Sequence, residues 1–293
     1  MKQSYSTKEL AEMWDVSEST VKRWADAGAL PCRKTVGGHR KFELDDIVEF
    51  QSRCGLAKLP AHLANGRSES PCEFKHLLET ADYGALAERF RQAALAGQFD
   101  FVTHLFNKSQ EYGMSLATIG EKLIRPAMRE VGELWRTGKI GVLDEHLAMV
   151  ATVEALAALR TNVERKSEVG QLAIVGCAEG ELHQLAAMIV RDLLESQDWQ
   201  VIYFGSPTPL FSFAEAVDRF QPQLVCISIT MADHIERARR DYEDLRRAAE
   251  RQQTKIVLGG TALTDTAVRA RFPESHYADS LHDLLNLVKK ESE

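Results

Sequence analysis

The sequence has few cysteines and lacks any long apolar run. Its 293 residues include five cysteines, which are widely spaced and form no C-x-x-C pair, so the sequence predicts neither a disulfide framework nor a zinc site. No apolar segment approaches the roughly 20 residues that a membrane-spanning helix needs. The N-terminal residues also lack the apolar core of a secretory signal. We therefore expect a cytoplasmic protein that has no membrane partner.

The groupings of side chains that are typical of enzymes are also missing. No nucleophile is accompanied by a base, no glycine-rich phosphate loop is present, and no carboxylate pair has the pattern of a general acid and base. The sequence therefore predicts a protein that is not an enzyme. Its length exceeds that of one ordinary domain and predicts two or three domains.

Acidic residues outnumber basic ones over the whole chain, but basic residues are concentrated near the N-terminus. The formal net charge is −7, which argues against a nucleic-acid-binding surface over the whole chain. Between Lys22 and Lys41, however, six basic residues accompany a single acid, Asp26. This local excess indicates a basic surface within an otherwise acidic protein.

Residues 4–53 have the pattern of two short helices, a hairpin and a further helix. Ser6 or Thr7 can cap the first helix, Ser17 can cap the second, and a Gly-Gly pair suits the hairpin tip. The second helix suits the major groove of DNA, and the hairpin suits phosphates or the neighbouring minor groove. The side chains expected to contact DNA are Ser19, Thr20, Lys22, Arg23, Arg33, Lys34, His39, Arg40 and Lys41. The alternative interpretation is a protein-interaction module whose charges form a solvated face.

The run VSESTVKRWADAGALPCRKTVGGHRKF carries a family resemblance. It resembles the MerR-type winged helix-turn-helix over about fifty residues. The resemblance implies that residues 1–54 form a domain that binds a double-stranded DNA operator.

The next two segments differ in composition. Residues 55–73 are rich in Gly, Pro, Ser and Asn and predict a linker. Residues 74–166 have the periodicity of four or five amphipathic helices without a strand pattern, which predicts a helical bundle.

From residue 170 to 293, short β-branched runs alternate with helical segments. The runs are LAIVGCA, VIYFG, LVCISIT, KIVLGG and SHYAD. This alternation predicts a doubly wound, flavodoxin-like, five-stranded parallel sheet, so the fold class is multidomain α and α/β. Ligands of such folds bind at the carboxyl ends of the strands.

Residues at the predicted strand ends suit a ligand that carries a metal and a long flat group. His183 follows the first strand and can donate to a transition metal, while Glu181 can fix its tautomer. Small residues after the third and fourth strands leave a slot close to the backbone. These slot residues are Ser228, Thr230, Gly259 and Gly260.

The motifs E-L-H-Q-L-A, S-I-T and G-G together resemble the signature of cobalamin (B12)-binding domains. The resemblance implies that His183 is the lower axial ligand of cobalt and that the nucleotide tail of the cofactor enters the slot. Two positions depart from the usual signature. Glu181 stands in place of an aspartate, and Ala186 stands in place of a glycine.

The segment LWRTGKIGVLDEHLAMVAT resembles the W-x(9)-E-H element of CarH-type regulators, which combine these three domains in the same order. The resemblance implies that Trp135, Val142, Glu145 and His146 line the upper side of adenosylcobalamin. It also implies that light releases the adenosyl group and that a DNA-bound homo-oligomer, a dimer or a tetramer, then comes apart. Arg136 stands where these photoreceptors have a cobalt-capturing histidine, so a bis-histidine light product would require His146 or another group. The alternative interpretation is an ordinary core tryptophan and a surface Glu-His pair.

The combined pattern predicts a cobalamin-dependent, light-responsive transcriptional repressor. One alternative is a corrinoid carrier for methyl transfer, against which the basic N-terminal segment counts. Another is a MerR-type regulator that senses a different tetrapyrrole or ligand. The sequence identifies neither the operator nor the sign of regulation.

Overall fold

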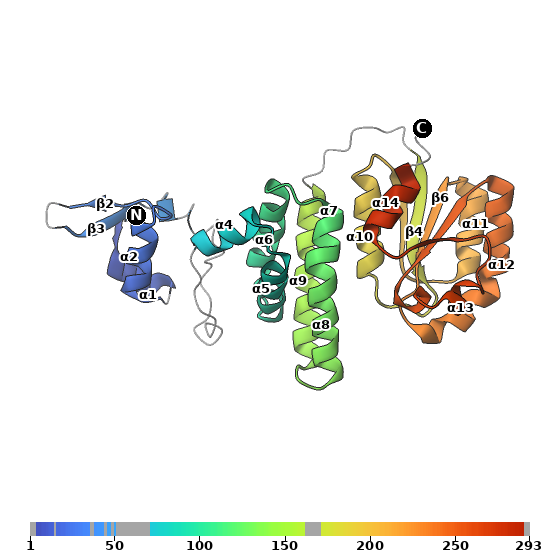
Figure 1. The fold of residues 1–293 in the computed structure, drawn as a ribbon, viewed down its shortest axis with the longest axis horizontal. Helices are drawn as coiled ribbons and strands as arrows, with labels where there is room; N and C mark the ends of the chain where they lie inside the picture. Colours follow the sequence, from blue (N-terminus) through green and yellow to red (C-terminus); the bar gives the residue numbers. More distant parts are fainter. Residues whose placement is uncertain are drawn as a thin grey trace. The chain divides into compact units, whose positions relative to one another are not determined.

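The computed structural model describes residues 4–14, 16–35, 38–43, 46–47, 50, 71–161 and 171–289 (Figure 1). The chain divides into two compact units, Met1–Leu159 and Arg160–Glu293. The first unit contains an N-terminal head and a helical bundle, and the second contains a parallel sheet. No helix in the described parts of the chain is both long and apolar enough to cross a bilayer.

The described residues of the N-terminal head include the helices α1 and α2 and a small antiparallel sheet, and Asp46, Ile47 and Phe50 are also helical. Its strand order is β1-β3-β2, so the hairpin β2–β3 follows the two helices in the sequence. The elements are β1 (Ser4–Ser6), α1 (Thr7–Trp14), α2 (Glu18–Asp26), β2 (Arg33–Lys34) and β3 (Arg40–Glu43).

Both helices of the head begin at side-chain caps. The backbone N–H of Ser6 donates to Glu9 Oε2 at 2.8 Å, and the N–H of Glu9 donates to Ser6 Oγ at 3.3 Å, which is a capping box. Ser17 Oγ accepts from the N–H of Thr20 at 3.2 Å. The caps predicted at Ser6 and Ser17 are therefore confirmed.

The core of the head is aromatic. The ring centroids of Trp24 and Phe50 lie 5.1 Å apart, those of Trp14 and Phe50 lie 5.5 Å apart, and those of Trp14 and Trp24 lie 5.8 Å apart. Leu10 and Val21 are buried beside them. Large rings compensate for the small number of residues that such a short segment can bury.

The bundle is entirely helical, as its periodicity predicts. Its elements are α4 (Pro71–Glu79), α5 (Tyr83–Leu95), α6 (Phe99–Glu111), α7 (Leu116–Thr118), the π-helical turn η2 (Ile119–Ile124), α8 (Arg125–Arg136) and α9 (Val142–Thr161). Helix α4 overlaps the end of the predicted linker 55–73, and the rest of that linker lies outside the described residues. The last residues of the predicted bundle, from 162 to 166, also lie outside them.

The second unit alternates strands and helices in the predicted way. Its strands pair in the order β5-β4-β6-β7-β8, and every pair is parallel. The strands are β4 (Leu172–Ala178), β5 (Gln200–Thr208), β6 (Leu224–Ser228), β7 (Lys255–Gly259) and β8 (His276–Ala278). The helical elements are α10 (Leu185–Glu195), α11 (Leu210–Phe220), η3 (Ala232–His234), α12 (Ile235–Gln252), η4 (Thr261–Leu263), α13 (Thr266–Arg269) and α14 (Leu281–Lys289).

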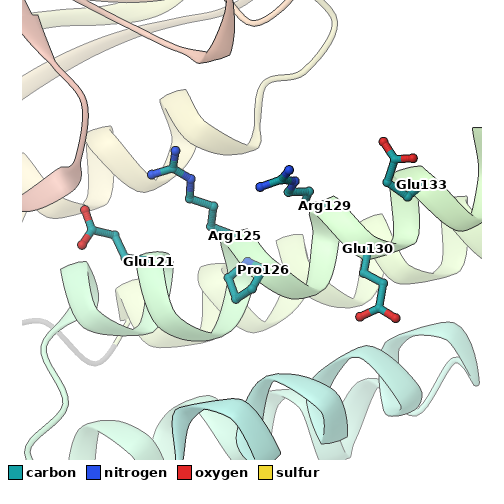
Figure 2. Close-up of a pocket in the computed structure, with 6 residues that line it drawn as sticks. All are labelled: Glu121, Arg125, Pro126, Arg129, Glu130 and Glu133. Atoms are coloured by element: carbon teal, nitrogen blue, oxygen red, sulfur yellow. The ribbon is translucent and has the colours of Figure 1, made fainter. Parts of the chain in front are cut away.

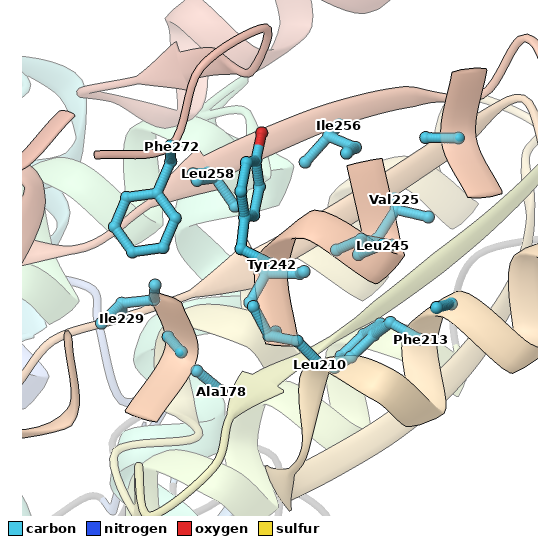
Figure 3. Close-up of a cluster of buried hydrophobic side chains, with 14 of the residues drawn as sticks. Ala178, Leu210, Phe213, Val225, Ile229, Tyr242, Leu245, Ile256, Leu258 and Phe272 are labelled. Carbon is cyan, nitrogen blue, oxygen red and sulfur yellow. The ribbon is translucent and has the colours of Figure 1, made fainter. Parts of the chain in front are cut away.

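Helices cover both faces of this sheet. Figure 1 shows α10 and α14 on one face, and α11 and α12 on the other. Figure 3 shows the core beneath α11 and α12, where Phe213, Tyr242 and Leu245 pack against strand residues such as Val225 and Leu258. The predicted five-stranded parallel sheet is therefore confirmed.

The strand order creates a topological switch point between β4 and β6. From β4 the chain crosses to β5 on one side, and it then returns to β6 on the other side of β4. The segments that follow β4 and β6 consequently leave the sheet in opposite directions, and the opening between them is where ligands of doubly wound folds bind.

We predict that Gly260→Ala destabilises the second unit. Gly260 has φ +118°, and a Cβ at this position would lie 2.2 Å from the carbonyl oxygen of Ile229. The unusual φ alone costs an alanine about 1–3 kcal/mol, and the backbone clash adds to that cost. Urea unfolding measures the loss. The matched control is Gly132→Ala in α8, where nothing lies within 4 Å of the added Cβ, and a stability equal to or above wild type is expected there. An unchanged free energy of unfolding for Gly260→Ala would contradict the prediction.

Candidate functional site

The sheet brings the predicted cofactor residues of the second unit to one edge. Glu181 and His183 follow β4, Thr230 follows β6, and Gly260 follows β7. The strand register places Ser228 between Cys177 of β4 and Gly259 of β7. Residues that are far apart in the sequence therefore meet at the carboxyl ends of adjacent strands, as predicted.

The Glu181 side chain joins the two segments that flank the switch point. Its Oε1 accepts from the backbone N–H of His183 at 2.9 Å and lies 2.6 Å from His183 Nδ1. Its Oε2 accepts from the N–H groups of Thr230 at 2.7 Å and of Met231 at 2.9 Å. The hydroxyl of Ser206 donates to the Glu181 carbonyl. Each carboxylate oxygen of Glu181 therefore has two hydrogen-bond partners.

These hydrogen bonds keep the fully buried carboxyl ionised. Burial on its own raises the pKa of Glu181, but the donors on His183, Met231 and Thr230 outweigh it and lower the pKa below its ordinary value. An ionised carboxylate only accepts hydrogen bonds, so Nδ1 of His183 carries a proton.

His183 is positioned to act as a ligand. With its proton on Nδ1, the neutral ring has its lone pair on Nε2, which is the atom that can donate to a metal. The side chain is 57% exposed, so Nε2 is accessible. A carboxylate that holds the second ring nitrogen is the usual support for a metal-bound histidine. The donor set therefore fits a cofactor whose metal needs one imidazole.

One of the residues of the predicted slot, Ser228, carries an unpartnered polar atom. Ser228 Oγ is buried and has no hydrogen-bond partner among the described residues. A buried hydroxyl without a partner is costly, and a ligand that enters the slot can satisfy it. An added Cβ at Gly259 or Gly260 would meet the backbone oxygen of Ala278 at 3.3 Å or of Ile229 at 2.2 Å, so these glycines allow neighbouring backbone segments to approach closely. The Ser228 hydroxyl fits a polar group of a nucleotide-bearing cofactor, and Thr230 contributes its N–H to Glu181.

The structure adds two residues that sequence reasoning missed. Leu182 is 75% exposed and Met231 is partly exposed, and they lie next to His183 and Thr230 in the chain. Exposed apolar side chains beside an imidazole that is free to bind a metal suit the face of a flat macrocycle. In the sequence, each is an apolar residue shortly after a strand, where polar residues are more usual.

Ala186, which stands where the usual signature has a glycine, is exposed in the first turn of α10.

The predicted cofactor residues of the bundle lie at the adjoining ends of α8 and α9. Trp135 is 51% exposed, so its interpretation as an ordinary core tryptophan is wrong. Val142 is also exposed. Nδ1 of His146 lies 2.6 Å from Glu145 Oε2. Arg136 donates from Nε and Nη2 to Glu133 Oε2 at 3.0 and 2.7 Å.

A separate pocket lies along η2 and α8. Figure 2 shows Arg125 and Arg129 extending side by side from the helix, with Glu121 and Glu133 on either side along the chain. Pro126 and Glu130 complete the lining. None of the predicted cofactor residues lines this pocket, and its acidic and basic charges largely cancel.

The predicted DNA contacts of α2 are exposed or half-buried. The hydroxyls of Ser19 and Thr20 lie 2.7 and 2.9 Å from Ser17 Oγ, so both take part in the cap of α2. Lys22 forms an exposed ion pair with Glu18 at 3.4 Å, and Arg23 is exposed.

Some of the hairpin residues predicted to contact DNA are exposed, and others pack or pair within the head. Arg33 lies 3.8 Å from Glu43 in an exposed pair, and Lys34 and His39 are also exposed. Arg40 is engaged within the head, because its guanidinium donates to Asp26 of α2 and its side chain is only 18% exposed. Arg40 therefore links the hairpin to α2, whereas the adjacent Lys41 is half-buried on β3.

We predict that Glu181→Gln destabilises the second unit and removes a pH-dependent component of its stability. The amide group of glutamine cannot accept all four hydrogen bonds, and each buried N–H left unpaired costs about 1–3 kcal/mol. Because the folded-state pKa of Glu181 is lowered, its stabilisation is present above the ordinary glutamate range and is lost as the pH falls through the folded value. Unfolding free energies at several pH values measure this component, with Glu179→Gln as the matched control. Equal pH profiles for Glu181→Gln and wild type would refute the prediction.

Comparison with protein families identifies three matching segments. Residues 171–278 match a B12 binding domain, residues 86–160 match a second B12 binding domain model, and residues 4–55 match a helix-turn-helix domain. Every predicted cofactor or DNA residue lies within one of these segments.

The chain is also similar to several corrinoid proteins of methanogens. The trimethylamine corrinoid protein of Methanosarcina barkeri is 27% identical over 186 residues, which cover 62% of this chain and 85% of the relative. Trimethylamine corrinoid protein 1 of Methanosarcina acetivorans is 26% identical over 180 residues, which cover 60% of this chain and 83% of the relative.

A solved structure shares the fold. The monomethylamine corrinoid protein of Methanosarcina barkeri superposes with a TM-score of 0.60 at 17% identity, over 71% of this chain and 99% of that protein. The helical part and the five-stranded parallel sheet thus fit the Rossmann-like B12-binding fold. The chain carries B12-binding domains and an N-terminal helix-turn-helix domain, a combination that fits a B12-binding regulator.

Proposed function

We propose that the protein is a cobalamin-dependent transcriptional regulator that binds double-stranded DNA through its N-terminal head. The observation that carries the proposal is the Glu181-held imidazole of His183 at the switch point, in a chain that also has a helix-turn-helix segment. A regulator of this kind needs no catalytic group.

His183 and the neighbouring slot would hold the cofactor. Nε2 of His183 is the proposed lower ligand of cobalt, and Ser228, Gly259 and Gly260 are the proposed neighbours of the nucleotide tail. The unpartnered hydroxyl of Ser228 supports this assignment because it lacks a partner inside the protein. Exposed Leu182 and Met231 supply apolar contact next to the imidazole.

We further propose that the cofactor is adenosylcobalamin and that light is the signal. A bound adenosylcobalamin supplies a cobalt–carbon bond that light can break. Trp135, Val142, Glu145 and His146 are the proposed neighbours of the adenosyl group. Their exposure supports this role, because two large apolar side chains remain uncovered on the bundle. If these contacts stabilise one arrangement of the protein, loss of the adenosyl group favours another.

The proposed output is release of DNA and relief of repression. In a dimer or tetramer, several heads would bind one operator at the same time, which increases the overall affinity. Disassembly would remove that gain and weaken DNA binding. In the head, α2 suits the major groove, and the exposed Arg33, Lys34 and His39 of the winged hairpin suit the phosphate backbone. The link from Arg40 to Asp26 supports a fixed angle between the hairpin and α2.

A corrinoid carrier for methyl transfer is the second candidate. The similarity to trimethylamine corrinoid proteins, which extends over 60% or more of this chain, supports it. The helix-turn-helix segment at residues 4–55 favours the regulator, because a carrier has no need of a basic DNA-binding surface.

We predict that His183→Ala weakens cobalamin binding and removes the histidine-bound absorption spectrum. Loss of an axial ligand should raise the dissociation constant by at least about tenfold, which corresponds to about 1.4 kcal/mol. Spectroscopic titration with adenosylcobalamin in the dark measures both effects. The control is His276→Ala, at the start of β8. If wild type and His183→Ala bind equally and give the same spectrum, the assignment of His183 fails.

We predict that Lys34→Ala, on the exposed hairpin, weakens DNA binding about equally for all sequences. Each lost phosphate contact should reduce the slope of log affinity against log salt by about 1. Fluorescence anisotropy with a random-sequence DNA duplex at several salt concentrations measures the slope. Arg247→Ala, an exposed position of α12, is the control. If the wild-type chain does not bind DNA but binds cobalamin, the carrier becomes the better interpretation.

A further inference from the structure

A single acid lies within the basic segment of the head, at the end of α2. Asp26 is the only acidic residue between Lys22 and Lys41, where six residues are basic. It is also the last residue of α2, and a negative charge at the C-terminal end of a helix is unfavourable because it opposes the helix dipole. Asp26 therefore weakens both the attraction to DNA and the end of its own helix, unless another contact compensates.

That contact is made by Arg40 of the hairpin. Nη2 of Arg40 donates to Oδ1 of Asp26. Arg40 shares a face of β3 with Phe42, because side chains two positions apart in a strand point the same way, and Phe42 is fully buried in the core of the head. Nε of Arg40 is also buried and has no partner among the described residues. The guanidinium is therefore held against the head rather than extended into solvent.

The residue opposite Arg40 in the hairpin has the accessibility that Arg40 lacks. The strand register pairs Lys34 of β2 with Arg40 of β3, and Lys34 is exposed. A contact with a DNA phosphate requires a charged group that can reach the surface of the duplex. Lys34 suits such a contact, whereas Arg40 suits a link between the hairpin and α2.

A link of this kind matters because two elements of the head are expected to reach neighbouring grooves. A helix and a hairpin bind one DNA site together only when the orientation between them is correct. If that orientation is fixed before binding, less of the binding free energy is used to order the hairpin.

We propose that Asp26 is a positioning residue that makes DNA binding selective, because its pair with Arg40 fixes the hairpin against α2. This inference rests on the proposed DNA binding by the head. Selective binding uses α2 and the hairpin together, whereas binding to arbitrary sequences depends mainly on charge. Loss of Asp26 should therefore weaken selective binding, although it removes a negative charge from the basic segment.

The test compares two DNA duplexes, one that the wild-type full chain selects from a random-sequence library and one of random sequence. Fluorescence anisotropy measures the affinity for each. Asp26→Ala should bind the selected duplex about tenfold more weakly, as expected for the loss of a charged hydrogen bond that orders the hairpin. It should bind the random-sequence duplex as tightly as wild type or more tightly, which also shows that the head is folded.

The matched control is Glu18→Ala, which removes the same charge from the same helix. Glu18 pairs with Lys22 at 3.4 Å within α2 and not with the hairpin. Glu18→Ala should not weaken binding to either duplex. If Asp26→Ala behaves in the same way, or weakens binding to both duplexes equally, the role of Asp26 is refuted.

A charge exchange separates positioning from direct contact. Asp26→Arg combined with Arg40→Asp restores an ion pair between α2 and the hairpin, so it should recover most of the selective affinity that Arg40→Asp alone loses. If Arg40 contacts a phosphate, the exchange cannot recover the affinity, because an acid at position 40 repels DNA. Failure of the exchange would refute the inference and leave DNA binding intact. If the wild-type chain selects no duplex, both the proposed function and this inference fail.

Discussion

The carboxylate of Glu181 is the group on which the candidate site depends. A buried charge is tolerated only when hydrogen bonds replace the water it has lost, and four donors do so here. Two of these donors belong to His183 and two belong to the segment after β6. Removing any one of them would leave the buried charge less well compensated, so the positions of both segments and of the imidazole are coupled.

Much of the second unit could be predicted because its signals are local. Each strand is a short β-branched run, and the rule that ligands bind at the carboxyl ends of parallel strands then brings His183, Ser228 and Gly260 together. The caps at Ser6 and Ser17 are also local, since each depends on a residue three positions away. Such features follow from sequence without knowledge of tertiary structure.

The remaining features depend on contacts between distant residues. The partners of Glu181 at Thr230 and Met231 are about fifty positions away, and nothing in the sequence near Glu181 identifies them. The contact of Arg40 with Asp26 was not predicted, because Asp26 lies within reach only after the hairpin folds back on α2. The helical periodicity alone does not predict the exposure of Trp135, because a tryptophan on an amphipathic helix has the same pattern whether it is covered or not. Only the family resemblance implied that it faces a ligand.

The two oxygens of Glu181 have a mechanical consequence. Oε1 is bonded to the imidazole of His183, and Oε2 is bonded to the backbone that leads into α12 through η3. The carboxylate is planar and is held at both oxygens, so a displacement of the imidazole is transmitted to that backbone. The His183 imidazole is thus connected to an 18-residue helix by a single side chain that has no exposed surface.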